Sequence, residues 1–356
     1  MRPRNILCWG IAGWILGGAP AMAAGLAPLP SPPGPARDRA SADRTELGKR
    51  LFFDRRLSGD GTMSCATCHD PDTGFGDGLP VSLSYPTTKN WRNAPTLINV
   101  AYRARLFWDG RAGSLEEQAL FPMASAFEMN QNIDFLEEEL KEVPEYVEAF
   151  RTVFGGEITR ARIAAALAAF ERTILSGDTP LDRFLRGDGG ALTPLQKEGH
   201  DLFVGRAGCV RCHSGATLSD GRYHNLGVPE DPKLSGDPRV AVTRRFVAKV
   251  SGFDGYRDLT ADPGRFLVTR DPGDWKAFLT PPLRNVADTG PYMHNGVFRS
   301  IAEVIGFYDR GGGNDPKKSP LLRPLRLSPA ERKALEAFLS EALSGPVSPM
   351  KPPRIP

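Results

Sequence analysis

Apolar residues recur with helical spacing in several segments of this chain, and the pattern predicts a mainly α-helical protein. Residues 133–141 and 144–153 place apolar side chains three or four positions apart, as in amphipathic helices. The two are separated at Val143-Pro144, because the residue before a proline disfavours helical backbone. Residues 158–175 are alanine-rich and apolar, and we expect a long helix there, buried between domains. The abundance of Gly and Pro elsewhere predicts long irregular loops.

Capping residues mark further helix starts. Thr193 precedes Pro194, an N-cap residue followed by proline at the first helical position. The capping-box signature, a Ser with Glu three residues later, occurs at three more places: Ser114, Ser300 and Ser328. We expect the helix after Ser114 to end near Pro122, and the last helix to end near residue 343.

A weak internal repeat divides the chain. The sequence L-G-K-R-L-F at 47–52 resembles E-G-H-D-L-F at 198–203, and each predicts a helix that leads into a similar motif loop. We expect one domain at residues 43–187 and another at 188–345, joined through a polar linker at 182–190 and followed by a tail at 346–356.

The first residues predict export. Arg2 and Arg4 precede an apolar run at 6–20, and Ala21-Met22-Ala23 supplies a small-residue cleavage site. Residues 1–23 therefore have the features of a secretory signal peptide, which places the mature protein in the periplasm. Residues 24–42 are rich in Pro and Ala, and we expect a flexible leader.

Charge and hydropathy exclude some partners. Loss of the signal peptide lowers the formal net charge from +3 to +1, so neither nucleic acid nor a membrane surface is an expected partner. No later apolar run approaches the roughly 18 residues that a membrane span needs.

The motif C-x-x-C-H occurs twice, at Cys65-Ala-Thr-Cys68-His69 and at Cys209-Val-Arg-Cys212-His213. It is typical of covalent haem attachment, in which both thiols bond to haem vinyl groups and the His ligates iron. The alternative is a zinc site, but zinc takes four ligands and each cluster offers three without a complementary pair nearby. Cys8 leaves with the signal peptide, so no thiol remains for a disulfide. We predict two covalently bound haem c groups.

The order of motifs resembles that of the bacterial di-haem cytochrome c peroxidases and their relative MauG. Over residues 43–342 the chain has, in sequence, C-x-x-C-H, R-N-A-P-T at 92–96, F-W-D-G-R-A at 107–112, E-M-N at 128–130, the second C-x-x-C-H, L-R-N-V at 283–286 and P-Y-M-H-N-G at 291–296. The resemblance implies two cytochrome c-like helical haem domains, the first reacting with hydrogen peroxide and the second transferring electrons.

The resemblance also assigns roles in the first domain. His69 would be the proximal ligand, and Glu128 and Gln118 would line the opposite, distal side of the haem. Cleavage of peroxide needs a proton moved between its two oxygens, which a carboxylate does well. Trp108 would relay electrons between the haems. Outside this motif context Glu128 would be an ordinary surface charge, Gln118 a helix-surface residue and Trp108 a core aromatic residue.

In the second domain His213 would ligate the iron. His224 lies in a long irregular region at 221–280 and would either touch a haem propionate or be structural, and His294 belongs to the P-Y-M-H-N-G motif. The family also holds a calcium ion between the haems; the matching groups here are the Asn93 side chain and the backbone carbonyls of Thr289 and Pro291. Oxygen ligands of this kind suit Ca²⁺.

Two positions divide the family. The cytochrome c peroxidases supply a His from the loop after the first motif, which blocks that iron until the second haem is reduced. Here no His occurs between Asp70 and Trp91, and Tyr85 is a poor substitute, so the first iron should be open in the resting state. The same peroxidases ligate the second iron with a Met at the position of Tyr308, where MauG has a Tyr. Met293 is the rival ligand.

Three functions follow. The first is a MauG-like enzyme that uses peroxide to reach a high-valent di-haem state and then oxidises a partner protein or other reductant. The second is a cytochrome c peroxidase that receives electrons from a small cytochrome or cupredoxin, and the third is an electron carrier. Glu128 argues against the carrier, and Tyr308 with the missing His favours the first function. Ala207 replaces the surface Trp that MauG uses, which argues against a methylamine dehydrogenase precursor as substrate.

Overall fold

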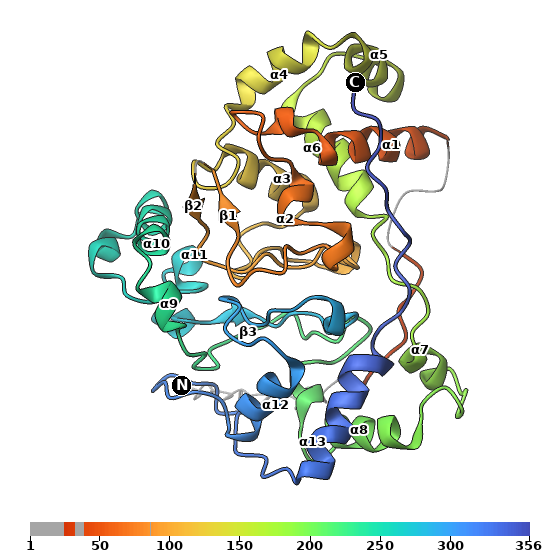
Figure 1. The fold of residues 1–356 in the computed structure, drawn as a ribbon, viewed down its shortest axis with the longest axis vertical. Coiled ribbons are helices and arrows are strands. Elements are labelled where there is room, and N and C mark those ends of the chain that lie inside the picture. The colour runs from red at the N-terminus through yellow and green to blue at the C-terminus, as the bar shows by residue number, and fades with distance from the viewer. Residues whose placement is uncertain (1–24, 33–38, 86) are drawn as a thin grey trace, which may run out of the picture.

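The computed structural model describes residues 25–32, 39–85 and 87–356 (Figure 1). The predicted signal peptide, with Cys8, lies outside the described residues. Within the described residues, no helix combines the length and apolar composition needed to cross a membrane.

The structure is mainly helical, which confirms the predicted fold class. Its longer helices are α1 (Arg39–Phe53), α3 (Leu115–Ala124), α4 (Ile133–Lys141), α5 (Pro144–Phe154), α6 (Arg160–Glu171), α7 (Pro180–Leu185), α8 (Pro194–Val204), α10 (Pro238–Val250), α12 (Ile301–Asp309) and α13 (Pro329–Ala337). The short helices are α2 (Cys65–Cys68), α9 (Pro232–Ser235) and α11 (Phe266–Thr269). It also has two small two-stranded antiparallel sheets, the hairpin of β1 (Leu83–Ser84) with β2 (Thr88–Lys89), and the pair of β3 (Tyr223–His224) with the distant β4 (Phe278–Leu279).

A close helix crossing builds the first half. Gly48 of α1 faces α6 so closely that a β-carbon there would lie 1.8 Å from the Ala166 carbonyl oxygen and 2.9 Å from the Phe170 side chain. Only glycine permits this approach. The crossing places Leu51 and Phe52 in an apolar core with the inner face of α6.

The second half repeats the crossing. Gly199 of α8 meets α13 in the same way, and a β-carbon there would lie 2.1 Å from the Ala334 carbonyl oxygen and 2.7 Å from the Phe338 side chain. Both crossings therefore pair a Gly with an Ala-x-x-x-Phe segment on the partner helix. The internal repeat of the sequence thus corresponds to a repeated helix pair, one above and one below the loop-rich middle of Figure 1.

Loops and ion pairs join the two halves. Arg92 forms a bidentate pair with Asp262, at 2.6 and 2.9 Å, and a 2.6 Å bond to Asp109. All three side chains are buried. Beside them Trp91 packs in a separate apolar cluster with Val240 and other residues of the 234–275 region.

The terminal segments cross between the halves. Residues 25–30 lie on the second half, where Gly25 and Ala27 pair with Gly215, and the Arg284 guanidinium donates to the Ala27 carbonyl oxygen. The tail runs back along one side of the molecule to the first half (Figure 1), where Val347 packs against the core. Residues 25–30 are therefore held by hydrogen bonds rather than forming a free leader. Helix α1 begins at Arg39, inside the expected leader 24–42.

Three expected elements differ from the structure. The apolar segment 158–175 forms the shorter α6, which is buried inside the first half against α1 and α3 rather than between domains. The expected linker begins within α7, whose Asp182 is buried and paired with Arg284. The region 221–280 contains the 13-residue helix α10, which starts at an Asp237 N-cap followed by Pro238.

Most cap-based expectations are confirmed. Helix α8 begins after Thr193, and α3, α12 and α13 begin after their predicted Ser caps. Helix α3 continues past Pro122 to Ala124. The last helix passes into a π-helical turn, Phe338–Ala342, so it ends near the expected residue.

Candidate haem sites

The first motif forms one helical turn. Ser64 caps α2 in a capping box with Thr67, and the backbone N–H of His69 donates to the Cys65 carbonyl oxygen at 3.0 Å. This bond places His69 directly after the turn that carries both cysteines. Burial raises the pKa of Cys65, and raises that of Cys68 to about 12.

The second motif has a related shape. Cys209–Arg211 is a 3₁₀ turn that follows Gly208, which has φ +65°. The backbone N–H of His213 donates to the Cys209 carbonyl oxygen at 2.9 Å. All four motif cysteines are free of disulfide bonds.

Both motif imidazoles are oriented by a backbone carbonyl. Nδ1 of His69 lies 3.0 Å from the Phe75 oxygen, and Nδ1 of His213 lies 3.0 Å from the Leu218 oxygen. Each Nδ1–H donates to its carbonyl, which leaves Nε2 free to bind iron, the arrangement usual for metal-ligating histidines. Phe75 and Leu218 adopt nearly equal positive φ values, 56° and 57°, so the two loops share a strained shape.

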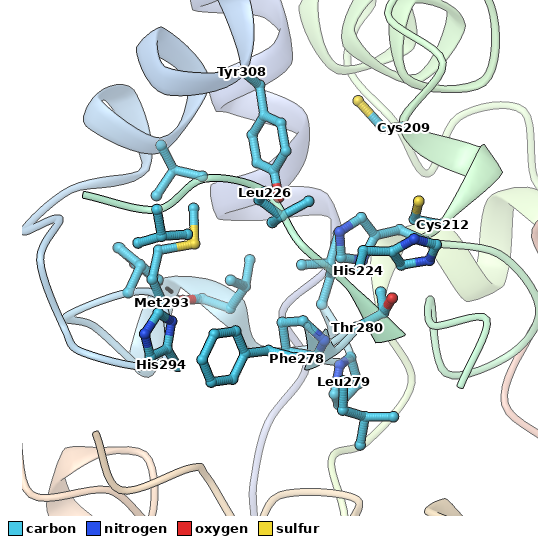
Figure 2. A pocket seen from close by; sticks show the side chains of 18 of the residues that line it. Cys209, Cys212, His224, Leu226, Phe278, Leu279, Thr280, Met293, His294 and Tyr308 are labelled. Atoms are coloured by element: carbon cyan, nitrogen blue, oxygen red, sulfur yellow. Dashed lines mark hydrogen bonds between the residues drawn. The ribbon is translucent and has the colours of Figure 1, made fainter. Parts of the chain in front are cut away.

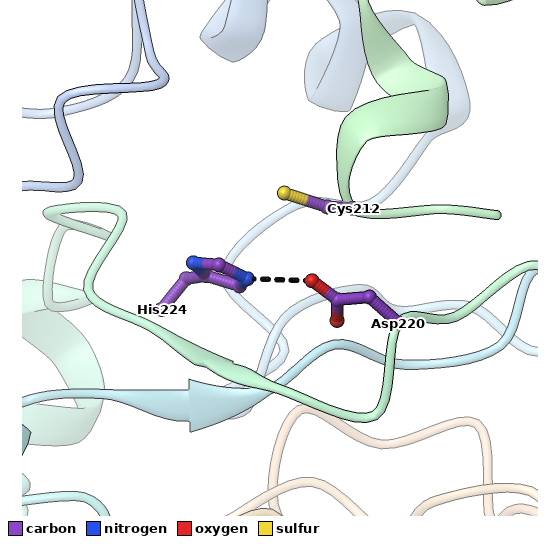
Figure 3. A group of neighbouring side chains, drawn as sticks. All are labelled: Cys212, Asp220 and His224. Carbon is purple, nitrogen blue, oxygen red and sulfur yellow. Dashed lines mark hydrogen bonds and ion pairs between the residues drawn. The ribbon is translucent and has the colours of Figure 1, made fainter. Parts of the chain in front are cut away.

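A zinc site within either motif is not supported. Among the described residues, the ligand atoms that gather within 4.8 Å of one another belong to Cys212, Asp220 and His224, a set without the motif's other Cys and His (Figure 3). His224 Nε2 and Asp220 Oδ2 form a 2.9 Å ion pair. The bonds with Asp220 and then Cys212 raise the pKa of His224 to about 9. A cationic His224 beside Cys212 fits the predicted propionate contact, which stays a prediction.

A cavity of about 250 Å³ lies beside the second motif. It is lined by Cys209, Cys212 and His213, and also by Tyr308 of α12 and many apolar residues. Figure 2 shows the Tyr308 ring pointing from α12 into this cavity, with the two cysteines to one side. Two thiols, an oriented imidazole and an apolar lining are what a covalent haem requires, so the residues fit that cofactor.

Tyr308 and Met293 both line this cavity. Burial raises the pKa of Tyr308, with the nearby Cys209 and Cys212 adding to the effect. Among the described residues, no group hydrogen-bonds the Tyr308 hydroxyl. An iron would stabilise the phenolate that this apolar site otherwise disfavours. Met293 extends from the loop before His294, and Figure 2 shows it on a different wall from Tyr308.

His294 is buried and stacks on Phe278, with ring centroids 3.6 Å apart and an interplanar angle of 12°. Burial lowers the pKa of His294 to about 4, so the ring is neutral at ordinary pH. Its carbonyl oxygen accepts a 2.7 Å bond from the Asn93 N–H. His294 therefore ties the second half to the first, and a direct contact with the cofactor stays a prediction.

Trp108 lies where the two halves meet. Its Nε1–H donates to the Asn93 carbonyl oxygen at 2.9 Å, and its own carbonyl oxygen accepts from the Leu279 N–H at 2.8 Å. The indole lines the second-haem cavity. This is a suitable place for an electron relay, and the role itself stays a prediction.

Glu128 has a partner that the sequence did not suggest. Asn90 donates from Nδ2 to Glu128 Oε1 at 3.0 Å, across 38 positions of sequence. The Tyr85 N–H donates to the Glu128 carbonyl oxygen, so the β1–β2 hairpin lies against the Glu128 loop. Glu128 also lies close enough to Cys68 to help raise the pKa of that thiol. Gln118 sits half-buried on α3 and makes no side-chain hydrogen bond within the described residues.

The residues of the predicted calcium site come from both halves. Asn93, Thr289 and Pro291 all line the cavity beside the second motif. The Asn93 amide nitrogen donates to the Leu79 carbonyl oxygen at 2.8 Å, which leaves its side-chain oxygen free for another partner. These donors are the hard oxygens that Ca²⁺ takes. The calcium site stays a prediction.

Sequence reasoning missed two features of this region. The Arg92–Asp109–Asp262 network joins residues up to 170 positions apart and has no local signature. The carbonyls that orient the two imidazoles come from Phe75 and Leu218, residue types that rarely adopt positive φ.

Two helical halves, each with a C-x-x-C-H loop and an oriented imidazole, define a di-haem c-type cytochrome. Residues 42–190 match the family model for di-haem cytochrome c peroxidase. The chain is 47% identical over 324 residues to cytochrome-c peroxidase IdrP1 of Pseudomonas sp., covering 90% of this chain and 85% of that protein. It is 37% identical over 320 residues to the methylamine utilization protein MauG of Methylorubrum extorquens, covering 89% and 83%.

Among solved structures, a MauG-like protein associated with microbial copper homeostasis aligns with a TM-score of 0.75 and 30% identity, over 89% of this chain and 93% of that chain. The chain belongs to the di-haem cytochrome c peroxidase family and is an oxidoreductase of the haem peroxidase type. Membership implies two haem c groups, in agreement with the two motifs.

Proposed function

We propose that this protein is a periplasmic MauG-like enzyme, which takes two oxidising equivalents from hydrogen peroxide and passes them to a partner protein or another reductant. The observation that supports this most is Tyr308, whose ring points from α12 into the second-haem cavity with the motif cysteines to one side. A phenolate is a hard anionic ligand that favours oxidised iron, and the axial ligand sets haem potential over a wide range.

The first site is where peroxide would react, and bound haem would supply the two-electron chemistry there. His69 holds Nε2 toward the iron position through its bond to the Phe75 carbonyl. Glu128 would accept a proton from the inner oxygen of peroxide and deliver it to the outer one. Between Asp70 and Trp91 no His is available to block the iron, so the site would be open before any reduction.

Trp108 would connect the two haem sites electronically, since it lies at the junction of the halves and lines the second cavity. A calcium ion held by Asn93, Thr289 and Pro291 would stiffen the same junction. Electrons from the substrate would not enter through a surface Trp as in MauG, because Ala207 occupies that position here.

A second candidate is a peroxidase that reduces hydrogen peroxide to water with electrons from a small cytochrome or cupredoxin. The name of the relative at 47% identity favours it. The two functions differ in what the resting enzyme does. If the MauG-like function is right, the diferric protein reacts with peroxide in stopped-flow spectroscopy without a reductant. If reaction appears only after one-electron reduction, a hidden ligand blocks the first iron and the second candidate is correct.

A further inference from the structure

The side chain of Asn90 is held in one orientation. Its Oδ1 accepts the Trp91 backbone N–H at 2.7 Å, and its Nδ2 donates to Glu128 Oε1 at 3.0 Å. With the oxygen engaged by a backbone donor, the amide cannot flip without losing both bonds. The Glu128 carboxylate is therefore presented with one oxygen occupied and the other free.

The segment that carries Asn90 is itself anchored from the second half. Thr243 of α10 donates from Oγ1 to the Lys89 carbonyl oxygen at 2.8 Å, and the Lys89 ammonium pairs with Asp237 at 2.8 Å. On the other side the Asn90 N–H donates to the Ser82 carbonyl oxygen at 2.9 Å. Asn90 thus has a fixed backbone on both sides, as a group must if it is to orient another side chain.

We propose that Asn90 is a positioning residue for peroxide cleavage: it fixes Glu128 through Oε1, so that Oε2 is the oxygen that moves the proton. This rests on the proposed role of Glu128. A hydrogen bond to a charged acceptor is among the stronger ones in proteins, and a misplaced catalytic group loses rate steeply. Asn90 lies in the stretch between Asp70 and Trp91 that lacks the family's blocking His, and its task here is to orient the acid–base group.

Asn90→Ala is the most informative variant because it removes the donor to Glu128 without adding a charge, whereas Asn90→Asp would place a second carboxylate against Glu128. We expect the peroxide reaction of the diferric protein to slow by about 10- to 100-fold, the kinetic equivalent of one hydrogen bond to a charged group. In a Glu128→Gln background the same change should slow the reaction no further, since Asn90 acts through Glu128. Asn314→Ala, the same change at an exposed residue, serves as the matched control.

A second readout does not depend on turnover. The infrared carboxylate band that disappears in Glu128→Gln should shift in Asn90→Ala, and hydrogen exchange over residues 81–91 should stay as in the wild type. If Glu128→Gln slows the reaction while Asn90→Ala reacts like the wild type with an unshifted band, the inference about Asn90 is wrong and the role of Glu128 stands. Slowing of the reaction by Asn90→Ala to the same extent in the wild-type and the Glu128→Gln proteins also overturns the inference. An unchanged rate in Glu128→Gln instead overturns the proposed function.

Discussion

The indole N–H of Trp108 donates a 2.9 Å hydrogen bond to the backbone oxygen of Asn93. Asn93 in turn donates its N–H to the carbonyl oxygen of His294 in the second half. The indole is thus fixed by a residue that itself spans the junction of the halves. We predict that Trp108, held in this way beside the second-haem cavity, relays electrons between the haems.

Replacement of Trp108 by Phe keeps an aromatic core residue and removes both the indole and its hydrogen bond. We expect each haem to be attached and ligated as before, while oxidation at the first site no longer reaches the second. The measurement is the change in second-haem absorption after peroxide is mixed with the diferric protein. Tyr256→Phe, in the apolar cluster of the 234–275 region, serves as the control. If Trp108→Phe and Tyr256→Phe give the same second-haem response, Trp108 is only a packing residue.

Glu128→Gln preserves the shape of the side chain and removes its ability to take up a proton. The reaction of peroxide with the resting protein should slow by about 10²–10⁴-fold, the usual range for a positioned acid–base group. Stopped-flow absorption measures the rate, and exposed Glu142→Gln provides a matched change of charge away from the site. A wild-type rate in Glu128→Gln would remove Glu128 from the mechanism.

The buried network around Arg92 predicts a dependence of stability on pH. Burial alone would raise the pKa of Asp109, but Arg92 and then Arg111 lower it from 3.8 to about 2. Because the pKa in the folded protein is below the ordinary value, this carboxylate stabilises the fold above about pH 4, and the contribution is lost as the pH falls toward 2. The difference corresponds to about 2 kcal/mol of unfolding free energy.

Asp109→Asn should therefore destabilise the protein by about 3–5 kcal/mol at neutral pH, since it leaves Arg92 short of a buried partner. The difference in unfolding free energy between Asp109→Asn and the wild type should decrease by about 2 kcal/mol as the pH falls from 5 to 2. Denaturant unfolding followed by circular dichroism measures both values, with exposed Asp72→Asn as the control. A gap that is constant over this range would mean that Asp109 does not titrate with the fold.

Much of the local structure followed from sequence. The two haem motifs, the Ser and Thr caps and the helices α4 and α5 depend on neighbouring residues, so spacing and capping chemistry predicted them. The bond between Asn90 and Glu128 could not be predicted in this way, because it joins two loops that meet only in the folded chain. The left-handed backbone at Phe75 and Leu218 likewise has no composition signal, since both residue types avoid that conformation.

Two predictions made from composition were wrong: the flexible leader at the start of the chain and the irregular region 221–280 in the second half. A Pro- and Ala-rich segment suggests flexibility, yet residues 25–30 are held through backbone groups, which composition does not reveal. Helix α10 was not predicted from the sequence, because its apolar Val242 and Phe246 are exposed and the usual amphipathic pattern is therefore weak. Its Asp237-Pro238 start was the usable signal.

The MauG-like function rests most directly on the second-haem ligand, and a spectroelectrochemical titration of the wild type, Tyr308→Met and Met293→Leu tests it. If the Tyr308 phenolate ligates the iron, Tyr308→Met should raise the reduction potential of the second haem, and Met293→Leu should leave it unchanged. Tyr308→Met should also weaken retention of the second oxidising equivalent after peroxide. A second-haem potential that is the same in the wild type and Tyr308→Met, or one that changes only in Met293→Leu, would contradict the account.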